Sequence, residues 1–269
     1  MKSKTVLVTG ASSGIGEATA QRLVMAGYKV YGTSRRAAKG RQGLFERLPL
    51  DVTSDDSVEA TVKEVLRLEG RIDLLVNNAG FGIAPGAAEE SSMEQARSIF
   101  ETNFFGIVRM TRAVVPHMRS QGSGRIINIS SVLGFLPAPY MALYSATKHA
   151  VEGYSESLDH ELRTRGIRVT VVEPAYTKTR FDANFLEPDS KLEEYREVRA
   201  ALGNHMKKVL ATAEEPGVVA DVVLEAASAQ SPKLRYAAGA LARRLRLLRR
   251  FAPAGLMDTG IRKDLRLTG

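Results

Sequence analysis

Short apolar segments alternate with longer amphipathic segments through most of the chain. The apolar segments are nearly continuous and rich in β-branched residues, as in TVLV (5–8) and VTVV (169–172). Runs of this kind are typical of strands that are covered on both faces. The pattern predicts six strands, within residues 4–10, 28–34, 44–52, 71–80, 124–131 and 167–174.

The amphipathic segments have apolar residues at helical spacing, and Ser54 or Asp55 is expected to cap one of these helices. The predicted helices cover residues 15–26, 54–69, 93–120 and 144–165. Strand–helix alternation implies right-handed crossovers and a parallel, doubly wound sheet. We therefore expect an α/β fold with three αβα layers and a single domain over residues 1–269. Residues 182–213 are expected to be polar helices that form a lid, and 241–269 a basic C-terminal extension.

A glycine-rich turn, TGASSGIG (9–16), follows the first strand and opens the first helix. Glycines permit a tight turn and a close backbone approach, and a helix N-terminus offers free N–H groups to a pyrophosphate. Such a turn can also be purely structural, but its place after the first strand favours a nucleotide site. The residues expected to hold the phosphates are Gly10, Ser12, Ser13, Gly14, Ile15 and Gly16.

The end of the second predicted strand reads Ser34-Arg35-Arg36 and has no carboxylate. An acidic residue here would bind the 2′-hydroxyl of NAD, whereas two guanidinium groups can bind a 2′-phosphate. We therefore expect NADP(H) in preference to NAD(H), although exposed arginines after a strand are also common. Asp51-Val52 follows the third strand, where Asp51 could accept a hydrogen bond from the adenine amino group or cap a turn.

Tyr144 and Lys148 lie four residues apart in YSATK, a spacing that places both on one helix face. The spacing alone does not decide between a catalytic pair and two unrelated surface residues. Three of the other tyrosines, Tyr31, Tyr176 and Tyr195, are followed by an arginine at the same distance.

Five motifs occur in a fixed order, and as a set they resemble the short-chain dehydrogenase/reductase family over about residues 4–240. They are TGxxxGIG at 9–16, NNAG at 77–80, a serine at 131, YSATK at 144–148 and EPAYTKT at 173–179. ETNFFG, INISS and YSATKHAVEGYSESL look most like the retinol and hydroxysteroid dehydrogenases of that family. The resemblance implies a Rossmann-like fold.

The family's catalytic tetrad would correspond to Asn103, Ser131, Tyr144 and Lys148. Tyrosine has an ordinary pKa of about 10, too high for ready proton exchange at neutral pH. An ammonium group one helical turn away, together with the positive nicotinamide of the oxidised cofactor, is expected to lower that pKa. Ser131 would donate a hydrogen bond to the substrate oxygen, and Asn103 would hold a water linked to Lys148. The structural alternatives are a strand-end cap for Ser131 and an ordinary helix polar residue for Asn103.

The resemblance also implies further contacts with the cofactor. Asn77 and Asn78 would stabilise the central sheet, and Thr179 would contact the nicotinamide carboxamide. The usual Pro-Gly of the family is Pro174-Ala175 here, and alanine would strain the loop if a positive φ were needed. The additional residues expected to bind the cofactor are Asn78, Ala79, Gly80, Tyr144, Lys148, Pro174, Thr177 and Thr179.

The residues expected to flank the catalytic pocket are mostly apolar, which suits a lipophilic ketone, aldehyde or alcohol, steroid-like or retinoid-like. A core or a dimer surface is the alternative explanation for each of them. They are Leu133, Gly134, Phe135, Leu136, Pro137, Pro139, Tyr140, Met141, Tyr176, Phe181 and Phe185.

Composition narrows the other possibilities. The chain has no cysteine, and its four histidines lack metal-ligand spacing, so we expect no metal site. No signal peptide and no apolar run of about 18 residues is seen, so a cytoplasmic location is expected. Long helices at 93–120 and 143–165 could form the face of a homodimer or homotetramer, as the family implies.

The basic character belongs to the C-terminal end. From Lys233 onward, ten basic and two acidic residues give +8, which is the net charge of the whole chain. LARRLRLLRRFAPAGL (241–256) is expected to pack its leucines on the domain with its arginines in solvent. Contact with an anionic membrane or an acyl-carrier surface is the alternative. No nucleic-acid partner is expected, because no reading motif is present.

The complete set of motifs predicts an NADP(H)-dependent oxidoreductase that interconverts a carbonyl and an alcohol, with Tyr144 as the acid/base. The rival hypotheses are a non-catalytic NADP(H) sensor or scaffold on the same fold, a peripheral membrane protein led by its basic tail, and different chemistry, such as epimerisation, on the same scaffold.

Overall fold

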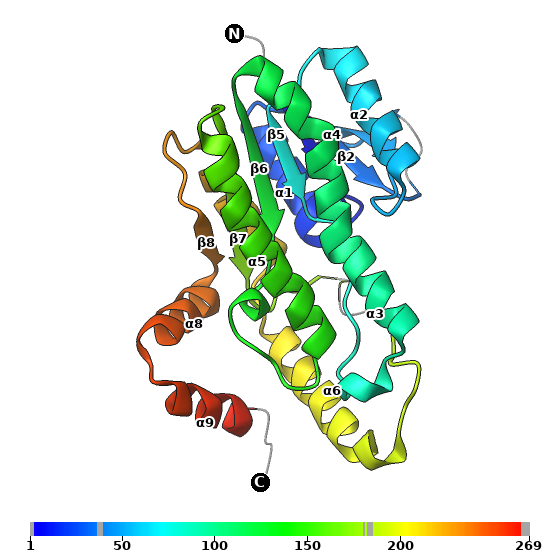
Figure 1. Ribbon diagram of the computed structural model, residues 1–269, viewed down its shortest axis with the longest axis vertical. Coiled ribbons are helices and arrows are strands. Elements are labelled where there is room, and N and C mark those ends of the chain that lie inside the picture. The colour runs from blue at the N-terminus through cyan, green and yellow to red at the C-terminus, as the bar shows by residue number, and fades with distance from the viewer. Residues whose placement is uncertain (1–2, 37–39, 180, 182–184, 265–269) are drawn as a thin grey trace.

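The chain folds around a mainly parallel sheet with helices on both faces, in one domain (Figure 1). The computed structural model describes residues 3–36, 40–179, 181 and 185–264. Within these residues the sheet has the strand order β3-β4-β2-β1-β5-β6-β7-β8, and every pairing is parallel except that of β3 with β4. The strands are β1 (Thr5–Val8), β2 (Lys29–Ser34), β3 (Gly40–Gln42), β4 (Phe45–Pro49), β5 (Leu74–Asn77), β6 (Gly124–Ile129), β7 (Ile167–Pro174) and β8 (Arg235–Ala238).

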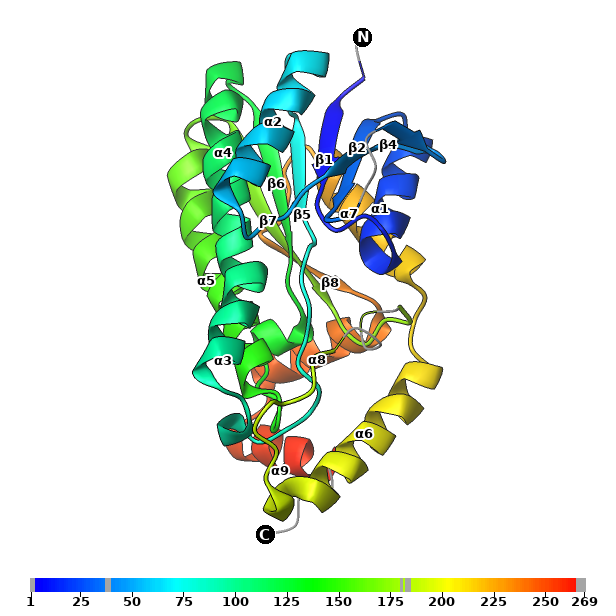
Figure 2. The same ribbon diagram turned by 90° about the vertical axis from the view of Figure 1, so that its right-hand side faces the viewer.

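The helices divide between the two faces of the sheet (Figure 2). Helices α1 and α7 cover one face, and α2, α4 and α5 cover the other. The α-helices are α1 (Gly14–Met25), α2 (Asp55–Glu69), α3 (Met93–Phe100), α4 (Gly106–Gln121), α5 (Ala142–Arg163), α6 (Arg196–Ala211), α7 (Pro216–Ser228), α8 (Ala240–Phe251) and α9 (Ala254–Asp264).

Alternate strand residues enter two separate cores. Val6 and Val8 of β1 pack toward α1 and α7, whereas Leu7 between them packs toward α2 and α4. Successive side chains of a strand point to opposite faces, so a strand between two helical layers must be apolar throughout. The near-continuous apolar runs of the sequence are therefore explained, and the predicted doubly wound Rossmann-like sheet is confirmed.

All six predicted strands and all four predicted helices are present, with three differences. The sequence patterns missed β8, which extends the parallel sheet beyond β7, and the short antiparallel edge strand β3. The helix predicted over 93–120 is two α-helices joined by a π-helical turn, Glu101–Phe105. A π turn preserves the amphipathic pattern on either side, so hydrophobic periodicity could not reveal it.

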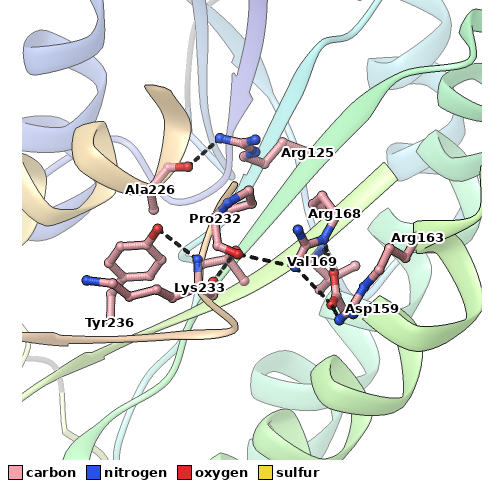
Figure 3. Close-up of polar contacts among 10 residues, drawn as sticks. Arg125, Asp159, Arg163, Arg168, Val169, Ala226, Pro232, Lys233 and Tyr236 are labelled. Carbon is pink, nitrogen blue, oxygen red and sulfur yellow. Dashed lines mark hydrogen bonds and ion pairs between the residues drawn. The ribbon is translucent and has the colours of Figure 1, made fainter. Parts of the chain in front are cut away.

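A buried carboxylate, Asp159, fastens α5 to the sheet at the amino ends of the strands (Figure 3). Its oxygens accept hydrogen bonds from Arg168 Nε (2.9 Å), from the Val169 backbone N–H (2.9 Å) and from Arg163. Arg168 also donates to the carbonyl of Pro232 (3.2 Å), in the segment that leads into β8. Burial alone would raise the pKa of Asp159, but the hydrogen bonds from the two arginines and the backbone outweigh it and lower the pKa to about 2.

Three helices from the last third of the chain extend beyond the carboxyl ends of the strands, whereas α7 and β8 belong to the body of the domain. Helices α6, α8 and α9 all lie at this end of the molecule (Figures 1 and 2). None of the described helices is long and apolar enough to cross a membrane.

Candidate active site

The carboxyl ends of β1, β5, β6 and β7 meet at one edge of the sheet, and the predicted motifs follow these ends. The strand order reverses between β1 and β5, and crevices at such a reversal are where doubly wound sheets bind ligands. Helix α5 begins beside this edge, so that its first turns face the ends of β6 and β7.

Tyr144, Ser131 and Lys148 come together at this edge. Ser131 follows β6, and its hydroxyl shares a hydrogen bond with the phenol of Tyr144 in the first turn of α5. One turn later, Lys148 Nζ donates to the carbonyl of Ile129 (2.9 Å) and lies 5.6 Å from the centre of the Tyr144 ring. The side chain of Lys148 is buried. The four-residue spacing thus places both groups against the same strand end.

The protonation of this pair differs from the sequence-based expectation. Burial raises the pKa of Tyr144 above its ordinary value, and the hydrogen bond with Ser131 only partly lowers it. Burial lowers the pKa of Lys148 to about 8, and Glu152 acts in the opposite direction. The lowering of the tyrosine pKa expected from the lysine is therefore not found, because desolvation of both groups is the larger effect, whereas the lowering expected from the nicotinamide stays a prediction.

Asn103 lies in the π-helical turn, and its amide binds a neighbouring loop. Its Oδ1 accepts from the Phe81 backbone N–H (3.0 Å), and its Nδ2 donates to the Phe81 carbonyl (2.8 Å) and to Thr147 Oγ1 (3.4 Å). A Cβ at Gly80 would come within 2.9 Å of Asn103 Oδ1, so only glycine allows this approach. Asn103 thus links the NNAG loop to α5, and the water relay through it stays a prediction.

The glycine turn after β1 has the shape that a pyrophosphate needs. Ser13 is the N-cap of α1 but makes no side-chain capping bond, so the first N–H groups of the helix remain available. A Cβ at Gly16 would come within 2.2 Å of the Gly10 carbonyl, so the turn is too tight for any side chain there. Ser12 is exposed, and Ile15 packs partly on the core. These residues fit a dinucleotide's phosphates.

Thr9, which was not among the predicted site residues, supports the turn from below. Its Oγ1 accepts from the backbone N–H groups of Asn78 (2.9 Å) and Ala79 (3.0 Å). Asn78 Nδ2 in turn donates to the carbonyls of Thr9 and Gly10, both at 3.0 Å. The position of Thr9 at the end of β1, before the first glycine, was the signal available in the sequence.

A buried line of amides joins the strands beneath the site. Asn77 Nδ2 donates to Asn128 Oδ1 (2.8 Å), and Asn128 Nδ2 donates to Ser155 Oγ (2.9 Å). The predicted sheet-stabilising role of Asn77 is confirmed, and Asn128 and Ser155 complete it. Hydrogen bonding of all three makes their burial tolerable.

The residues predicted to surround the adenosine lie at and after the carboxyl ends of β2 and β4. Arg35 and Arg36 follow β2 directly and are exposed, whereas Ser34 is half-buried. Asp51 caps a turn, because its Oδ1 accepts from Thr53 N (2.9 Å) and Thr53 Oγ1 (2.7 Å). These two hydrogen bonds also lower the pKa of Asp51. Val52 is buried and would meet a Cβ placed at Gly106 at 2.8 Å.

The segment after β7 lies against the glycine turn. A Cβ at Gly14 would come within 3.1 Å of the Thr179 side chain, so these two predicted cofactor residues are neighbours. Pro174 is the last residue of β7, and Thr177 Oγ1 donates to the Ala175 carbonyl (3.1 Å). Ala175 does not have a positive φ, so the strain expected at this alanine is absent.

Comparison with known proteins agrees with this geometry. A family model described as short chain dehydrogenase matches residues 4–190. This chain belongs to the short-chain dehydrogenase/reductase family. A relative of Bacteroides thetaiotaomicron, named 3-ketodihydrosphingosine reductase, is 46% identical over 184 residues, which are 68% of each chain.

Solved structures of this family superpose over most of the chain. A short-chain dehydrogenase of Streptomyces avermitilis has a TM-score of 0.79 and 34% identity, covering 99% of this chain and 96% of that one. ElxO with NADP bound has a TM-score of 0.74 and 25% identity, covering 88% and 97%. A 3-ketoacyl-(acyl-carrier-protein) reductase of Brucella melitensis with NADH has a TM-score of 0.74 and 27% identity, covering 87% and 96%.

A small cavity of about 20 Å³ lies beside the family tyrosine, and its lining agrees only in part with the wall expected from the sequence. Of the predicted wall, only Tyr140 and Met141 line this pocket; Phe181 contacts the Tyr144 ring edge to face (5.9 Å) and Phe185 packs on Phe181 (5.3 Å). Leu136 is buried in the core instead. The other side was not predicted from the sequence, because its small residues carry no aromatic signal. The pocket is lined by Ile83, Ala84, Gly86, Ala87, Ala88, Ser91 and residues 140–144.

A cluster of buried charges lies behind Lys148 and was also not predicted. Glu152, one helical turn after Lys148, accepts from Arg235 Nε (2.8 Å), and Glu173 of β7 forms an ion pair with Arg246 of α8. Both carboxylates are buried, and each retains one oxygen without a hydrogen bond. Burial and the nearby Glu152 raise the pKa of Glu173 to about 7. The partners come from β8 and α8, elements that the sequence patterns did not join to the sheet.

Proposed function

We propose that this chain is an NADP(H)-dependent oxidoreductase that interconverts a ketone or aldehyde and an alcohol on a lipophilic substrate. The observation that carries the proposal is the contact of Ser131 with Tyr144, with Lys148 one turn below, beside a glycine turn that fits a dinucleotide.

The reaction needs a hydride at carbon, which the bound nicotinamide would supply, and a proton at oxygen. Ser131 would donate a hydrogen bond to the substrate oxygen, and the phenol of Tyr144 would give the proton. The phenol of Tyr144 is protonated at neutral pH, as an acid in carbonyl reduction must be, although its raised pKa makes it a weaker acid than an exposed tyrosine. Lys148 would hold the nicotinamide ribose and stabilise the phenolate that forms.

The preference for NADP(H) rests on Arg35 and Arg36. Both guanidinium groups are exposed at the end of β2, and neither forms an ion pair with a described carboxylate. Relatives with NADP and relatives with NADH have both been solved, so these two residues of the chain itself are the basis of the proposal.

The substrate is proposed to be lipophilic because the pocket beside Tyr144 is lined mainly by apolar and small residues. The relative named 3-ketodihydrosphingosine reductase directs attention to ketones on long alkyl chains. Steroid-like and retinoid-like carbonyl compounds are the other candidates from the sequence.

Residues 182–213 are proposed to act as a lid over the pocket. This segment is bound to the pocket wall, since Gln95 Nε2 donates to the Glu187 carbonyl (2.8 Å) and Ser92 N donates to Asp189 (2.7 Å). Buried Glu90 also forms an ion pair with Arg199 of α6. Residues 182–184 of the predicted lid lie outside the described residues.

A non-catalytic NADP(H) sensor or scaffold is the second candidate. The burial of Lys148 and of Glu152 beside it argues against it, because a binding module gains nothing from two buried charges at this position.

A panel of carbonyl substrates distinguishes the proposed oxidoreductase from a non-catalytic sensor or scaffold. The protein is incubated with NADPH or NADH and with 3-ketodihydrosphingosine, steroid ketones, retinal or short-chain ketones, and loss of the reduced cofactor's absorbance is followed. We expect oxidation of NADPH that depends on a lipophilic carbonyl. Tight binding of NADPH with no turnover of any carbonyl would favour the sensor.

A further inference from the structure

The basic helix α8 docks on the domain mainly through Ala242 and Arg246, and of its leucines only Leu245 is partly buried. Arg246 forms an ion pair with buried Glu173, and its guanidinium lies 5.5 Å from the centre of the Phe135 ring. Ala242, one turn earlier on the same face, is fully buried. The expectation that leucines face the domain and arginines face solvent therefore fails for Arg246 and for the exposed leucines, whereas partly buried Leu245 and the four exposed arginines agree with it. A guanidinium can satisfy the buried carboxylate, whereas a leucine cannot.

This docking turns the apolar residues of α8 outward. Leu247 is 61% exposed and Phe251 is 74% exposed, and their spacing of four residues puts them on one face. Leu241 and Leu248 add to this face at 41% exposure each, and Leu256 of α9 is 63% exposed. We call these five residues the apolar ridge. Single exposed apolar residues are ordinary, but a set on adjoining helices marks an interaction surface.

Arginines lie beside the ridge and, at Arg244, within it. Arg243, Arg244, Arg249 and Arg250 are all exposed, and within the described residues no carboxylate pairs with any of them. The segment from Lys233 onward has a charge of +8, while the rest of the chain sums to zero. The partner of the ridge must therefore combine an apolar phase with negative charge.

We propose that α8 and the start of α9 dock on an anionic phospholipid surface, with the apolar ridge inserted among the acyl chains and the arginines at the phosphates. Amphipathic helices with basic flanks bind lipid surfaces in this way. A second copy of this chain fits the surface poorly, because a symmetric contact would bring the exposed arginines Arg243, Arg244, Arg249 and Arg250 of two copies together.

The docking surface lies at the carboxyl ends of the strands, the same end as α6 (Figures 1 and 2). Through Phe135 and Glu173, α8 also contacts the loop after Ser131 and the strand β7. A docked molecule would thus present the catalytic end of its sheet toward the bilayer.

Co-sedimentation of the full-length chain with vesicles tests the proposal. The vesicles are phosphatidylcholine alone or phosphatidylcholine mixed with phosphatidylglycerol, at low and at high salt. Leu247→Asp/Phe251→Asp disrupts the ridge, and Arg243→Gln/Arg244→Gln/Arg250→Gln removes three charges. Met25→Asp and Leu68→Asp, at exposed apolar positions of α1 and α2, are the matched controls.

We expect the native chain and both controls to sediment with the anionic vesicles at low salt and to be released by high salt. The arginine variant should bind roughly 100-fold more weakly, at about fivefold for each of the three charges removed. The ridge variant should also lose binding, and circular dichroism and turnover should show that both variants remain folded.

Three results would overturn the proposal. The native chain could remain in the supernatant with anionic vesicles, or the ridge variant could bind as well as the native chain. A ridge variant whose mass in solution, without vesicles, falls to that of the monomer from a larger native assembly would show that a second copy covers the ridge. None of these results depends on whether the proposed reaction is correct.

Discussion

The ionisation of single residues at the site depends more on their burial than on their spacing in the sequence. Lys148 and Tyr144 lie one helical turn apart, yet the pKa of each is shifted by desolvation toward its neutral form. Sequence spacing places the two groups on one face of α5, but it contains no information on how much water reaches them. The ionisation of the pair therefore became clear only from the structure.

The lowered pKa of Lys148 predicts a pH dependence for carbonyl reduction. Burial brings this pKa to about 8, so the ammonium that should stabilise the phenolate is lost as the pH rises through 8. We expect kcat/KM to be level below pH 8 and to fall by about tenfold per pH unit above it. Tyr144 does not contribute to this fall, because its own pKa is raised.

Lys148→Arg provides the control, since a guanidinium stays charged over the accessible range. Its kcat/KM is expected to be lower throughout but level across pH 8. The same fall in the arginine variant would assign the titration to another group.

Arg35 and Arg36 are predicted to select the cofactor. Replacing both with alanine removes the two groups that would bind the 2′-phosphate, while NADH needs neither of them. We expect the KM for NADPH to rise by about 10- to 100-fold and the KM for NADH to change little. Steady-state kinetics with both cofactors measures this change.

Arg119→Ala, an exposed arginine near the end of α4, is the matched control and should leave both KM values unchanged. An unaltered KM for NADPH in the double variant would refute the assignment of the 2′-phosphate site.

At the scale of the elements, hydrophobic periodicity and the motifs at the strand ends were enough to predict most of the sheet and the edge that holds the site. The apolar runs fixed β1, β2 and β4 to β7, and the motifs at their carboxyl ends located Gly10, Ser131 and Tyr144 at one edge. Strand β8 was not predicted because RYAA has only four residues and a weak apolar pattern. The orientation of α8 could not be predicted, because its amphipathic pattern does not say that Glu173 needs a cationic partner.

Asp159 is predicted to contribute substantially to the docking of α5 on β7. Asp159→Ala leaves two arginines and the Val169 N–H without their acceptor, so we expect the free energy of unfolding at pH 7 to fall by about 2 to 3 kcal/mol. Chemical denaturation of the two proteins measures this difference. Glu161→Gln, at an exposed position of the same helix, should change stability by less than about 0.5 kcal/mol.

The pH dependence of that difference gives a second check. The pKa of Asp159 in the folded chain, about 2, is below its ordinary value of 3.8, so its contribution is complete above pH 3.8 and lost as the pH falls through 2. The gap between native and variant should therefore narrow on acidification. A gap that is absent at pH 7, or that widens toward pH 2, would contradict the role given to Asp159.

At the scale of the whole molecule, the two helical layers leave α4 and α5 open to solvent on one side (Figure 2). Phe105, in the π-helical turn before α4, is 45% exposed, and a Cβ at Gly153 on α5 would meet nothing within 4 Å. A helical surface with an exposed aromatic residue and open space above a glycine suits a two-fold contact between copies of the chain.

We therefore predict a homodimer or homotetramer built on this surface. Phe105→Asp places a charge in the contact and should shift the protein to a smaller assembly at micromolar concentration, as light scattering during size-exclusion chromatography would report. Phe251→Asp, which alters the apolar ridge instead, should not change the mass of the assembly. A native chain that is monomeric, or a Phe105 variant of unchanged mass, would rule out this contact.

The central claim concerns the hydroxyl of Tyr144, and Tyr144→Phe tests it most directly because it removes that oxygen and little else. NADPH binding and turnover of a carbonyl substrate are measured on the same preparation. The account predicts a dissociation constant for NADPH within about threefold of the native value and a fall in kcat of at least about 100-fold, the usual contribution of a positioned acid. A Tyr144→Phe protein that binds NADPH and retains kcat within about threefold of the native chain would contradict it.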